Sequence, residues 1–296
     1  MSLSQQFFSP IAAGVWKWGT WGHDLDTQAQ LKLIEVCIEE GITTFDHADI
    51  YGHYTDEERF GKALAIKPSL RRQMKLVTKC GIKLITPNRP GHKIKSYDTG
   101  RKHIIQSVEN SLRALQTDYI DVLLIHRPDP LMDADEIAET FSWLQRQGKV
   151  LHFGVSNFTP FQFSLLQDRF PLVTNQIEAS ILRLEPFLDG TLDQCQRFRI
   201  VPMAWSPLGS GRLFTGEKDE RTQAILQVAC QLGQLHNAAV DQILLAWLLR
   251  HPAGIVPVLG TAKAERIRSA KGALQVQLSR EEWFELWQAS AGKEVP

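Results

Sequence analysis

The sequence predicts an α/β fold, a single (β/α)8 TIM barrel spanning residues 1–296, with its active site at the C-terminal mouth. Eight short apolar segments each precede a helical pattern, which is the repeating unit of this fold. The segments lack polar alternation, as is typical of parallel strands buried on both faces. No linker-like stretch interrupts the chain. A two-domain doubly wound fold is the alternative, and the absence of a GxGxxG motif after the first strand argues against it.

Each predicted strand is a short run of β-branched, aromatic or other apolar residues that ends at polar residues or glycine. We expect strands over 11–16, 42–45, 75–78, 119–125, 150–155, 172–174, 201–204 and 255–259. The polar segment from Gly81 to Gly100 follows the third strand and is too long for a passive connection. We therefore expect it to have a binding or lid role.

The predicted helices follow from apolar residues at helical spacing and from capping residues at their ends. Asp26 is placed to cap the first helix, in which Leu31 and Ile34 lie on one face, and Gly41 ends it. Thr159 caps a helix whose first residue is proline. We expect helices over 27–40, 57–66, 104–115, 133–147, 160–168, 188–197, 222–235, 239–250, 263–273 and 280–290.

The bulk composition is that of an ordinary globular protein, with 43% hydrophobic and 22% charged residues. Lys plus Arg and Asp plus Glu are equal at 33 each, so no global field favours nucleic acid or an anionic membrane. Residues 1–10 lack the basic and apolar regions of a signal peptide, and the apolar run 243–249 is too short to span a bilayer. We expect a soluble, cytoplasmic protein without nucleic-acid or membrane partners.

The four cysteines are scattered and form no CxxC pair. We interpret Cys37, Cys80, Cys195 and Cys230 as free thiols in a reducing compartment, and we expect neither a disulfide framework nor a thiolate metal site.

Polar or aromatic side chains follow the carboxyl ends of successive predicted strands, and a barrel brings those ends around one mouth. In chain order they are Asp46 with Tyr51, Lys79, His126, Ser156 with Asn157, Gln176, Trp205 with Ser206, and Gly260 with Thr261. Taken singly, each has a structural explanation, such as a solvated charge or a turn. Their joint placement indicates a functional site.

Four of these residues suit the reduction of a carbonyl group, which needs a hydride and a proton. Tyr51 can give the proton, although an ordinary phenol with a pKa of about 10 is a weak acid at neutral pH. We expect the ammonium of Lys79 to lower the pKa of Tyr51 and Asp46 to keep Lys79 charged and oriented. His126 is suited to donate a hydrogen bond to the substrate oxygen.

The motifs that carry these residues resemble those of the aldo-keto reductase family over essentially the whole chain. They are FDHADIYG, TKC, LLIHRPDP, GKVLHFGVSNF, NQIE and AWSPLGSGRL. Within the family, HRPDPLMDADE, HFGVSNFTP and DGTLDQ are similar to the bacterial YdhF-type oxidoreductases. The resemblance places Tyr51, Lys79, Asp46 and His126 at the catalytic positions.

The resemblance also implies NADPH or NADP+ as the cofactor, held without a Rossmann fold. It assigns the nicotinamide carboxamide to Ser156, Asn157 and Gln176, and the ring face to Trp205. The remaining cofactor contacts that it implies are Ser206, Leu208, Gly209 and Gly211 for the pyrophosphate, and Thr261, Lys263 and Arg266, beside Gly260, for the 2′-phosphate and adenine. Gly260 stands where many relatives carry lysine, which leaves NADH as an alternative donor.

We expect the substrate pocket to include Trp16, His47 and Arg127, and we expect Trp18 to shape it as well. His47 departs from the small residue that is common beside the catalytic aspartate, and a packed structural role is its alternative. The pocket does not identify the carbonyl substrate. The family resemblance makes a monomer the usual expectation. We expect no metal site.

Two other functions remain open from the sequence. The first is a cofactor-sensing regulatory module with little turnover. The second is a Schiff-base aldolase that uses Lys79 as its nucleophile. The presence of Asp46, Tyr51 and His126 beside Lys79 argues against the aldolase. The predicted function is therefore the reduction of an aldehyde or ketone, with NADPH as the preferred hydride donor.

Overall fold

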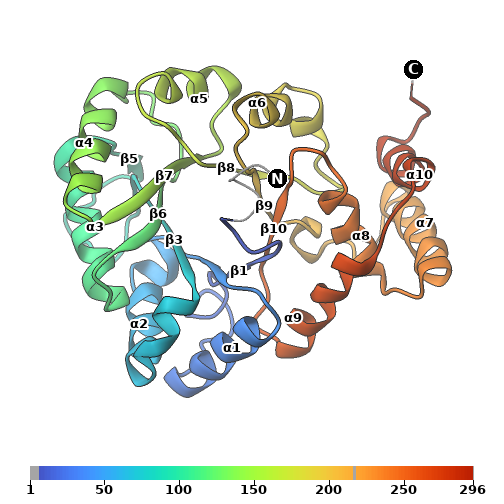
Figure 1. The fold of residues 1–296 in the computed structure, drawn as a ribbon, viewed down its shortest axis with the longest axis horizontal. Coiled ribbons are helices and arrows are strands. Elements are labelled where there is room, and N and C mark those ends of the chain that lie inside the picture. Colours follow the sequence, from blue (N-terminus) through green and yellow to red (C-terminus); the bar gives the residue numbers. More distant parts are fainter. Residues whose placement is uncertain (1–6, 216–217, 296) are drawn as a thin grey trace.

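The computed structural model describes residues 7–215 and 218–295. We expect no signal peptide in residues 1–10, and residues 1–6 of that segment lie outside the described residues. Eight parallel strands form a closed barrel in the order β1-β10-β9-β8-β7-β6-β3-β2 (Figure 1), which confirms the predicted fold class. The strands are β1 (Ala12–Gly14), β2 (Thr44–Asp46), β3 (Lys75–Cys80), β6 (Ile120–Ile125), β7 (Val150–Ser156), β8 (Asn175–Glu178), β9 (Met203–Trp205) and β10 (Val256–Leu259).

Helices surround the barrel. Those of the ring are α1 (Thr27–Glu39), α2 (Asp56–Ile66), α3 (Arg101–Leu115), α4 (Ala134–Arg146), α5 (Pro160–Gln167), α6 (Thr191–Phe198), α8 (Val240–Leu249) and α9 (Ala264–Lys271). Two more, α7 (Glu220–His236) and α10 (Arg280–Ala291), lie together outside the ring on one side of the molecule (Figure 1). Two predicted caps are present: Asp26 accepts from the Ala29 amide at 2.8 Å, and Thr159 forms a capping box with Gln162.

Several elements differ from the prediction, among them the sixth strand, α6 and the segment from Gly81 to Gly100. The sixth strand spans Asn175–Glu178, whereas the sequence predicts 172–174. Gln176 therefore lies inside β8 and not beyond its end. The helix α6 begins at Thr191 because Gly190, at φ 85°, and the Asp189 carboxylate, which accepts from the Thr191 amide, form the turn before it. The segment from Gly81 to Gly100 contains a short antiparallel pair, β4 (Ile82–Lys83) and β5 (Ser96–Tyr97), which the sequence did not predict.

The barrel interior has an apolar layer below a polar one. Buried apolar side chains of the strands fill the lower layer: Ala12, Val77, Val122, Leu124, Met203, Val256 and Val258. Side chains alternate between the two faces of a strand, so the next inward position beyond Val77 is Lys79, and the next beyond Leu124 is His126. This alternation places the predicted site residues directly above a packed floor at the C-terminal mouth.

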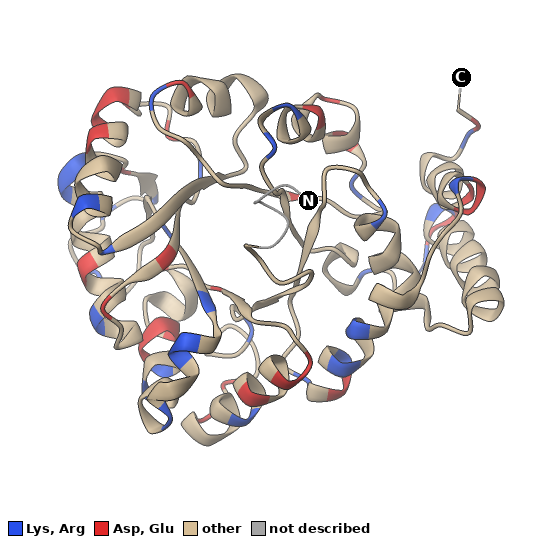
Figure 2. Cartoon of the chain, viewed as in Figure 1, with Lys and Arg blue, Asp and Glu red and all other residues tan. Residues whose placement is uncertain are grey.

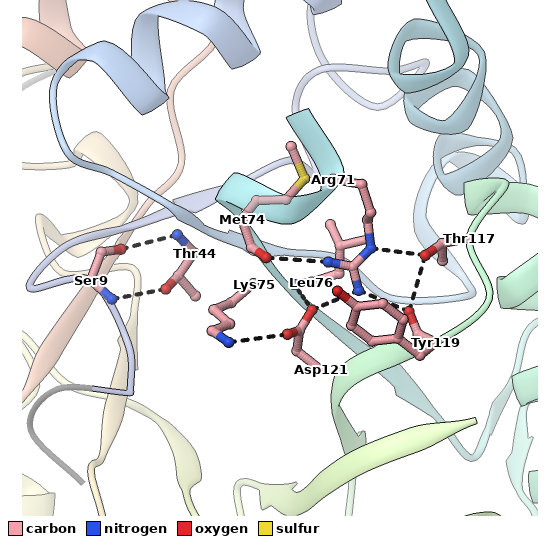
Figure 3. A network of polar contacts seen from close by, with 9 residues as sticks. All are labelled: Ser9, Thr44, Arg71, Met74, Lys75, Leu76, Thr117, Tyr119 and Asp121. Atoms are coloured by element: carbon pink, nitrogen blue, oxygen red, sulfur yellow. Dashed lines mark hydrogen bonds and ion pairs between the residues drawn. The ribbon is translucent and has the colours of Figure 1, made fainter. Parts of the chain in front are cut away.

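The opposite end of the barrel is held by a buried ion pair (Figure 3). The Arg71 guanidinium donates to Asp121 Oδ2 at 2.7 Å, to Thr117 Oγ1 at 2.8 Å and to the Tyr119 carbonyl at 2.9 Å. The same carboxylate oxygen accepts from the Leu76 amide at 2.9 Å. These contacts join the starts of β3 and β6, so they stabilise the end of the barrel opposite the mouth.

The N-terminal segment also packs against this end. Ser9 and Thr44 exchange two hydrogen bonds of 3.0 Å each between amide and hydroxyl (Figure 3). A hollow of about 440 Å³ lies beside them, and Arg72 and Lys75 are the ionisable groups among its described lining residues. Two cations offer no acid–base pair, so these lining residues do not form a catalytic site.

Charges of both signs are interspersed over the same outer helices (Figure 2), as the balanced composition suggests. Within residues 7–215 and 218–295, no helix combines the length and the apolar character needed to cross a membrane.

Candidate active site

Lys79 lies at the centre of a buried polar cluster. Its ammonium donates to Asp46 Oδ1 at 2.9 Å and Oδ2 at 2.8 Å, to the His47 carbonyl at 2.7 Å and to the Tyr51 hydroxyl at 3.1 Å. Asp46 and Lys79 are only 3% and 1% exposed. An ammonium has three N–H donors, and three groups accept hydrogen bonds from it here: the Asp46 carboxylate, the His47 carbonyl and the Tyr51 hydroxyl. The phenol oxygen accepts from Lys79, which leaves the phenol's own proton free to be donated.

A strained turn directs Tyr51 back over Lys79. Gly52, His53 and Tyr54 all have positive φ, of 56°, 59° and 70°. A Cβ atom at Gly52 would lie 1.9 Å from Asp56 Oδ1, so any larger residue here would displace the Asp56 side chain, and the positive φ also favours glycine. Consecutive left-handed residues are uncommon and concentrate at functional sites.

The ionisation of the cluster differs in one respect from the expectation. Burial raises the pKa of Tyr51 above its ordinary value, and the nearby Lys79 only partly opposes this. Lys79 does act to lower the pKa of Tyr51, as predicted, but desolvation of the phenolate outweighs the ammonium, so the net shift of this pKa is upward. For Lys79, burial acts to lower the pKa, but Asp46 and Tyr51 together raise it above the ordinary value. The lysine is charged and the tyrosine is protonated at neutral pH.

His126 is neutral in this environment. Burial lowers its pKa well below the ordinary value, and the cations Lys79 and Arg127 act in the same direction. Its ring centroid lies 6.0 Å from that of Tyr51. Nδ1 is buried and has no hydrogen-bond partner among the described residues, so Nε2 is the nitrogen available at the mouth. A neutral imidazole with Nε2–H can donate to an oxygen held beside the Tyr51 hydroxyl.

His47 and Trp18 do not line the mouth. Trp18 differs from the expectation, whereas His47 has the packed structural role that was its alternative. His47 is completely buried, and its ring packs edge-on against Phe60 of α2 at a centroid distance of 4.4 Å. It is the outward neighbour of the inward Asp46, and burial lowers its pKa to about 3. Trp18 packs against Phe45, and its Nε1 donates to the Thr261 carbonyl at 2.9 Å. Only the backbone carbonyl of His47 enters the site.

Three of the residues predicted to hold the nicotinamide, Ser156, Asn157 and Trp205, are linked by side-chain hydrogen bonds. Trp205 Nε1 donates to Asn157 Oδ1 at 2.9 Å, and Asn157 Nδ2 donates to Ser156 Oγ at 2.7 Å. Asn157 has a positive φ of 59°, which directs its side chain across the strand ends. Ser156 is paired in register with Gln176, whose side chain instead reaches Asp46 at 2.8 Å.

Two backbone amides of the loop after β9 already form hydrogen bonds within the loop. The Gly209 amide donates to the Ser206 carbonyl at 2.8 Å, and the Gly211 amide donates to the Leu208 carbonyl at 3.2 Å. The hydroxyls of Ser206 and Ser210 lie 2.8 Å apart and are exposed. The exposed hydroxyls are thus better placed for a pyrophosphate in this conformation than the two glycine amides.

The predicted phosphate residues lie together at the start of α9. Lys263 is the N-cap residue of this helix, and its amide donates to Thr261 Oγ1 at 3.2 Å. Arg266 follows in the first turn and is exposed. A helix N-terminus with two nearby cations is a suitable environment for an anion. A Cβ atom at Gly260 would lie 3.2 Å from Trp16 Nε1, so Trp16 occupies the space beside this position.

The rim of the mouth carries aromatic and basic side chains. Trp16 is 38% exposed, and the Arg127 guanidinium lies 5.7 Å from the centroid of the Trp205 ring. Among the described residues, no carboxylate forms an ion pair with Arg127. The segment from Gly81 to Gly100 is tied to the Tyr51 turn, because the Tyr54 hydroxyl donates to the Ile82 carbonyl at 3.2 Å and accepts from the Leu84 amide at 3.1 Å.

Comparison with known proteins agrees with this arrangement. The profile of the Aldo/keto reductase family matches residues 10–291. The chain belongs to the aldo/keto reductase family. It is 46% identical to "Oxidoreductase YdhF" of Escherichia coli, with 98% of this chain and 96% of that protein covered, which confirms the expected subgroup.

Two further proteins are similar over nearly the whole chain. A "6-dehydroglucose reductase" of Agrobacterium fabrum is 48% identical, covering 97% of this chain and 96% of that protein. An aldo/keto reductase of Klebsiella pneumoniae, solved with NADP and acetate, superimposes with a TM-score of 0.76 at 29% identity. The match covers 94% of this chain and 90% of that chain.

Sequence reasoning missed three contributors to this aldo/keto reductase site. The His47 carbonyl binds Lys79, but a backbone group leaves no trace in the residue type. The Trp21 ring lies edge-on to the Tyr51 ring at a centroid distance of 6.1 Å. The three tryptophans close together near the first strand are the sequence feature that could have indicated it. The contact between Gln176 and Asp46 joins residues 130 positions apart and depends on closure of the barrel.

Proposed function

We propose that this protein is an NADPH-dependent reductase of aldehydes or ketones. The observation that carries the proposal is the hydrogen bond from the Lys79 ammonium to the Tyr51 hydroxyl, with Asp46 and the His47 carbonyl holding the same ammonium. This arrangement leaves a phenol proton available beside a fixed positive charge. The NADP complex of the similar Klebsiella pneumoniae protein supports the choice of cofactor.

The proton transfer follows from the ionisation states. NADPH, when bound, supplies the hydride. Tyr51 gives its proton to the carbonyl oxygen as negative charge develops there, and the Lys79 ammonium stabilises the resulting phenolate. Asp46 keeps Lys79 charged in a site where burial alone would favour the neutral amine. The neutral His126 donates a hydrogen bond to the same substrate oxygen and so orients the carbonyl.

The residues around the mouth fit a nicotinamide nucleotide. Ser156, Asn157 and Gln176 offer the donors and acceptors that a carboxamide requires, and the Trp205 ring provides a face for stacking. The exposed hydroxyls near Ser206 suit a diphosphate. Thr261, Lys263 and Arg266 at the start of α9 suit a 2′-phosphate, and this supports NADPH over NADH.

A polyhydroxylated aldehyde is the substrate class that we propose. The relative of Agrobacterium fabrum that is named a 6-dehydroglucose reductase supports this class. Arg127 has no ion-pair partner among the described residues and carries five N–H donors beside the reacting site, which suits hydroxyl groups next to a carbonyl. Replacement of Arg127 by methionine should lower kcat/KM for D-glyceraldehyde more than for propanal.

The aldolase alternative needs an unprotonated Lys79 amine that is free to attack a carbonyl. The raised pKa of Lys79 and its four oxygen contacts disfavour such a nucleophile. Borohydride trapping of a carbonyl substrate on Lys79 would restore that alternative.

The proposed function is tested in two steps. Fluorescence titration of the purified protein with NADPH and with NADH should show tighter binding of NADPH. A panel of hydroxylated, aliphatic and aromatic aldehydes should then give turnover, followed by the absorbance of the reduced cofactor. Binding of NADPH without multiple turnover would support the regulatory module instead, and absence of binding would contradict both.

A further inference from the structure

A hydrogen bond crosses the barrel at the level of the catalytic cluster. Gln176 Nε2 donates to Asp46 Oδ1 at 2.8 Å. Asp46 lies on β2 and Gln176 on β8, and these strands are four places apart in either direction around the eight-stranded barrel. The two side chains are 3% and 2% exposed. The bond therefore joins opposite walls through the buried interior, above the apolar floor.

This bond completes the set of donors around the Asp46 carboxylate. Lys79 donates to both carboxylate oxygens from β3, and Gln176 donates to Oδ1 from the far wall. A carboxylate with donors on one side only can swing with its partner. Donors on both sides fix the plane of the carboxylate, and so fix where the Lys79 ammonium must sit.

The contact also fixes the orientation of the Gln176 amide. An ionised carboxylate only accepts hydrogen bonds, so Nε2 must face Asp46 and Oε1 must face away from it. Gln176 is paired in register with Ser156, the first residue of the proposed nicotinamide seat, which comprises Ser156, Asn157 and Trp205. Gln176 thus contacts the proton-donating cluster through its side chain and the seat through its backbone carbonyl, which accepts from the Asn157 amide at 2.8 Å.

We propose that Gln176 is a positioning residue that holds the Asp46 carboxylate, and through it the Lys79 ammonium, in fixed relation to the nicotinamide seat. The inference rests on the proposed function where it concerns catalysis. The contact between Gln176 and Asp46 itself does not, because it can be tested in the protein without cofactor or substrate. The role goes beyond holding the carboxamide, since it predicts that Gln176 acts on proton donation.

The first test is an exchange of the two partners in the cofactor-free protein. Gln176→Glu alone places two carboxyl groups in contact. The contact is favourable only while one of them is protonated, because two carboxylates repel each other. Its urea midpoint should therefore fall as pH rises through neutrality. Asp46→Asn with Gln176→Glu restores one amide and one carboxylate, and the double variant should recover stability relative to the sum of the single changes. Simple additivity of the two changes would overturn the contact.

The second test separates positioning from cofactor binding. Gln176→Leu should lower kcat at saturating NADPH by about tenfold or more, because a displaced Lys79 supports Tyr51 poorly. Ser156→Ala is the matched control, since it removes a neighbouring hydroxyl of the nicotinamide seat that does not touch Asp46. It should raise the Kd for NADPH with a smaller effect on kcat.

Gln176→Glu should also add an ionisation to the pH profile of kcat that Ser156→Ala lacks. If Gln176→Leu raises only the Kd for NADPH, as Ser156→Ala does, the positioning role is contradicted. If the unmodified protein has no carbonyl turnover, the proposed function fails, and the exchange experiment alone decides whether Gln176 holds Asp46.

Discussion

Lys79 is a buried cation whose three N–H donors are matched by oxygen acceptors. Two acceptors are side chains, Asp46 and Tyr51, and one is the backbone carbonyl of His47. Burial alone would favour the neutral amine, and the adjacent carboxylate reverses that preference. Removal of one member of such a buried pair leaves an uncompensated charge and costs about 3–5 kcal/mol of folding free energy.

His126 should not titrate in the physiological range. Its pKa lies well below the ordinary value because of burial and the nearby Lys79 and Arg127. The neutral, hydrogen-bonding form is therefore the populated one as pH falls through about 6.5, the ordinary value for histidine. We expect kcat for carbonyl reduction to stay flat between about pH 6 and pH 8.

His126→Gln is the matched variant for this expectation, because glutamine keeps a donor and cannot titrate. Measured pH profiles of the two proteins should have the same shape. An inflection near neutrality that disappears in His126→Gln would show that the histidine ionises there.

At the scale of elements, the turn after β2 places Tyr51 by means of Gly52. Gly52→Ala introduces a Cβ atom 1.9 Å from Asp56 Oδ1 at a φ of 56°. We expect a loss of about 1–3 kcal/mol in unfolding free energy and a lower kcat, since the turn must shift. Gly41→Ala has a similar φ of 77° but meets no atom within 4 Å, so it isolates the conformational cost. Equal effects of the two changes on kcat would contradict a role of Gly52 in placing Tyr51.

Helices α2 and α3 are joined to β3 by a buried carboxyl. Glu57 accepts from Thr78 Oγ1 at 2.6 Å and from Ser111 Oγ at 2.8 Å, and burial raises its pKa to about 7. The folded state thus holds this proton more tightly than the unfolded chain. The associated stability, about 3 kcal/mol for a shift from 4.5 to about 7, is present below the unfolded pKa and is lost as pH rises through the folded one.

Glu57→Gln removes this titration while keeping the shape of the side chain. The stability of the variant relative to the unmodified protein should therefore increase from about pH 5 to about pH 8, measured by urea denaturation. Glu58→Gln changes an exposed neighbour on the same helix and should leave the pH dependence unaltered. A pH dependence that is identical in all three proteins would contradict the assignment to Glu57.

At the scale of the whole molecule, the barrel keeps stability and chemistry at opposite ends. The ion pair between Arg71 and Asp121 closes the N-terminal end, far along the strands from the cluster around Lys79. Arg71→Met leaves the buried Asp121 carboxylate with only the partly exposed Lys75, at 3.4 Å, as an ion-pair partner, so we expect a loss of up to about 3–5 kcal/mol in unfolding free energy. The Kd for NADPH, measured where the variant is folded, should stay unchanged.

Arg72→Met is the control for that change, because Arg72 is exposed and adjacent in sequence. It should alter neither stability nor binding appreciably. A weaker Kd for NADPH in folded Arg71→Met would show that the two ends of the barrel are coupled.

The sequence was informative where periodicity decides structure. The run of short apolar strands predicted the barrel, and the polar residues that follow them predicted Lys79, Asp46, Tyr51 and His126 as one cluster. Strand alternation also placed His47 opposite Asp46, although that signal was not applied to it. The contact from Gln176 to Asp46 was out of reach, because it depends on how far β8 is displaced along the barrel. The pKa of Tyr51 was out of reach as well, since it balances burial against charge in three dimensions.

The central claim is that Tyr51 donates the proton in an NADPH-dependent reduction. The most direct measurement compares the unmodified protein and Tyr51→Phe in the reduction of D-glyceraldehyde at saturating NADPH. The account predicts that kcat falls by about 10²- to 10⁴-fold in Tyr51→Phe while the Kd for NADPH stays within a few-fold. Full activity of Tyr51→Phe would contradict the account.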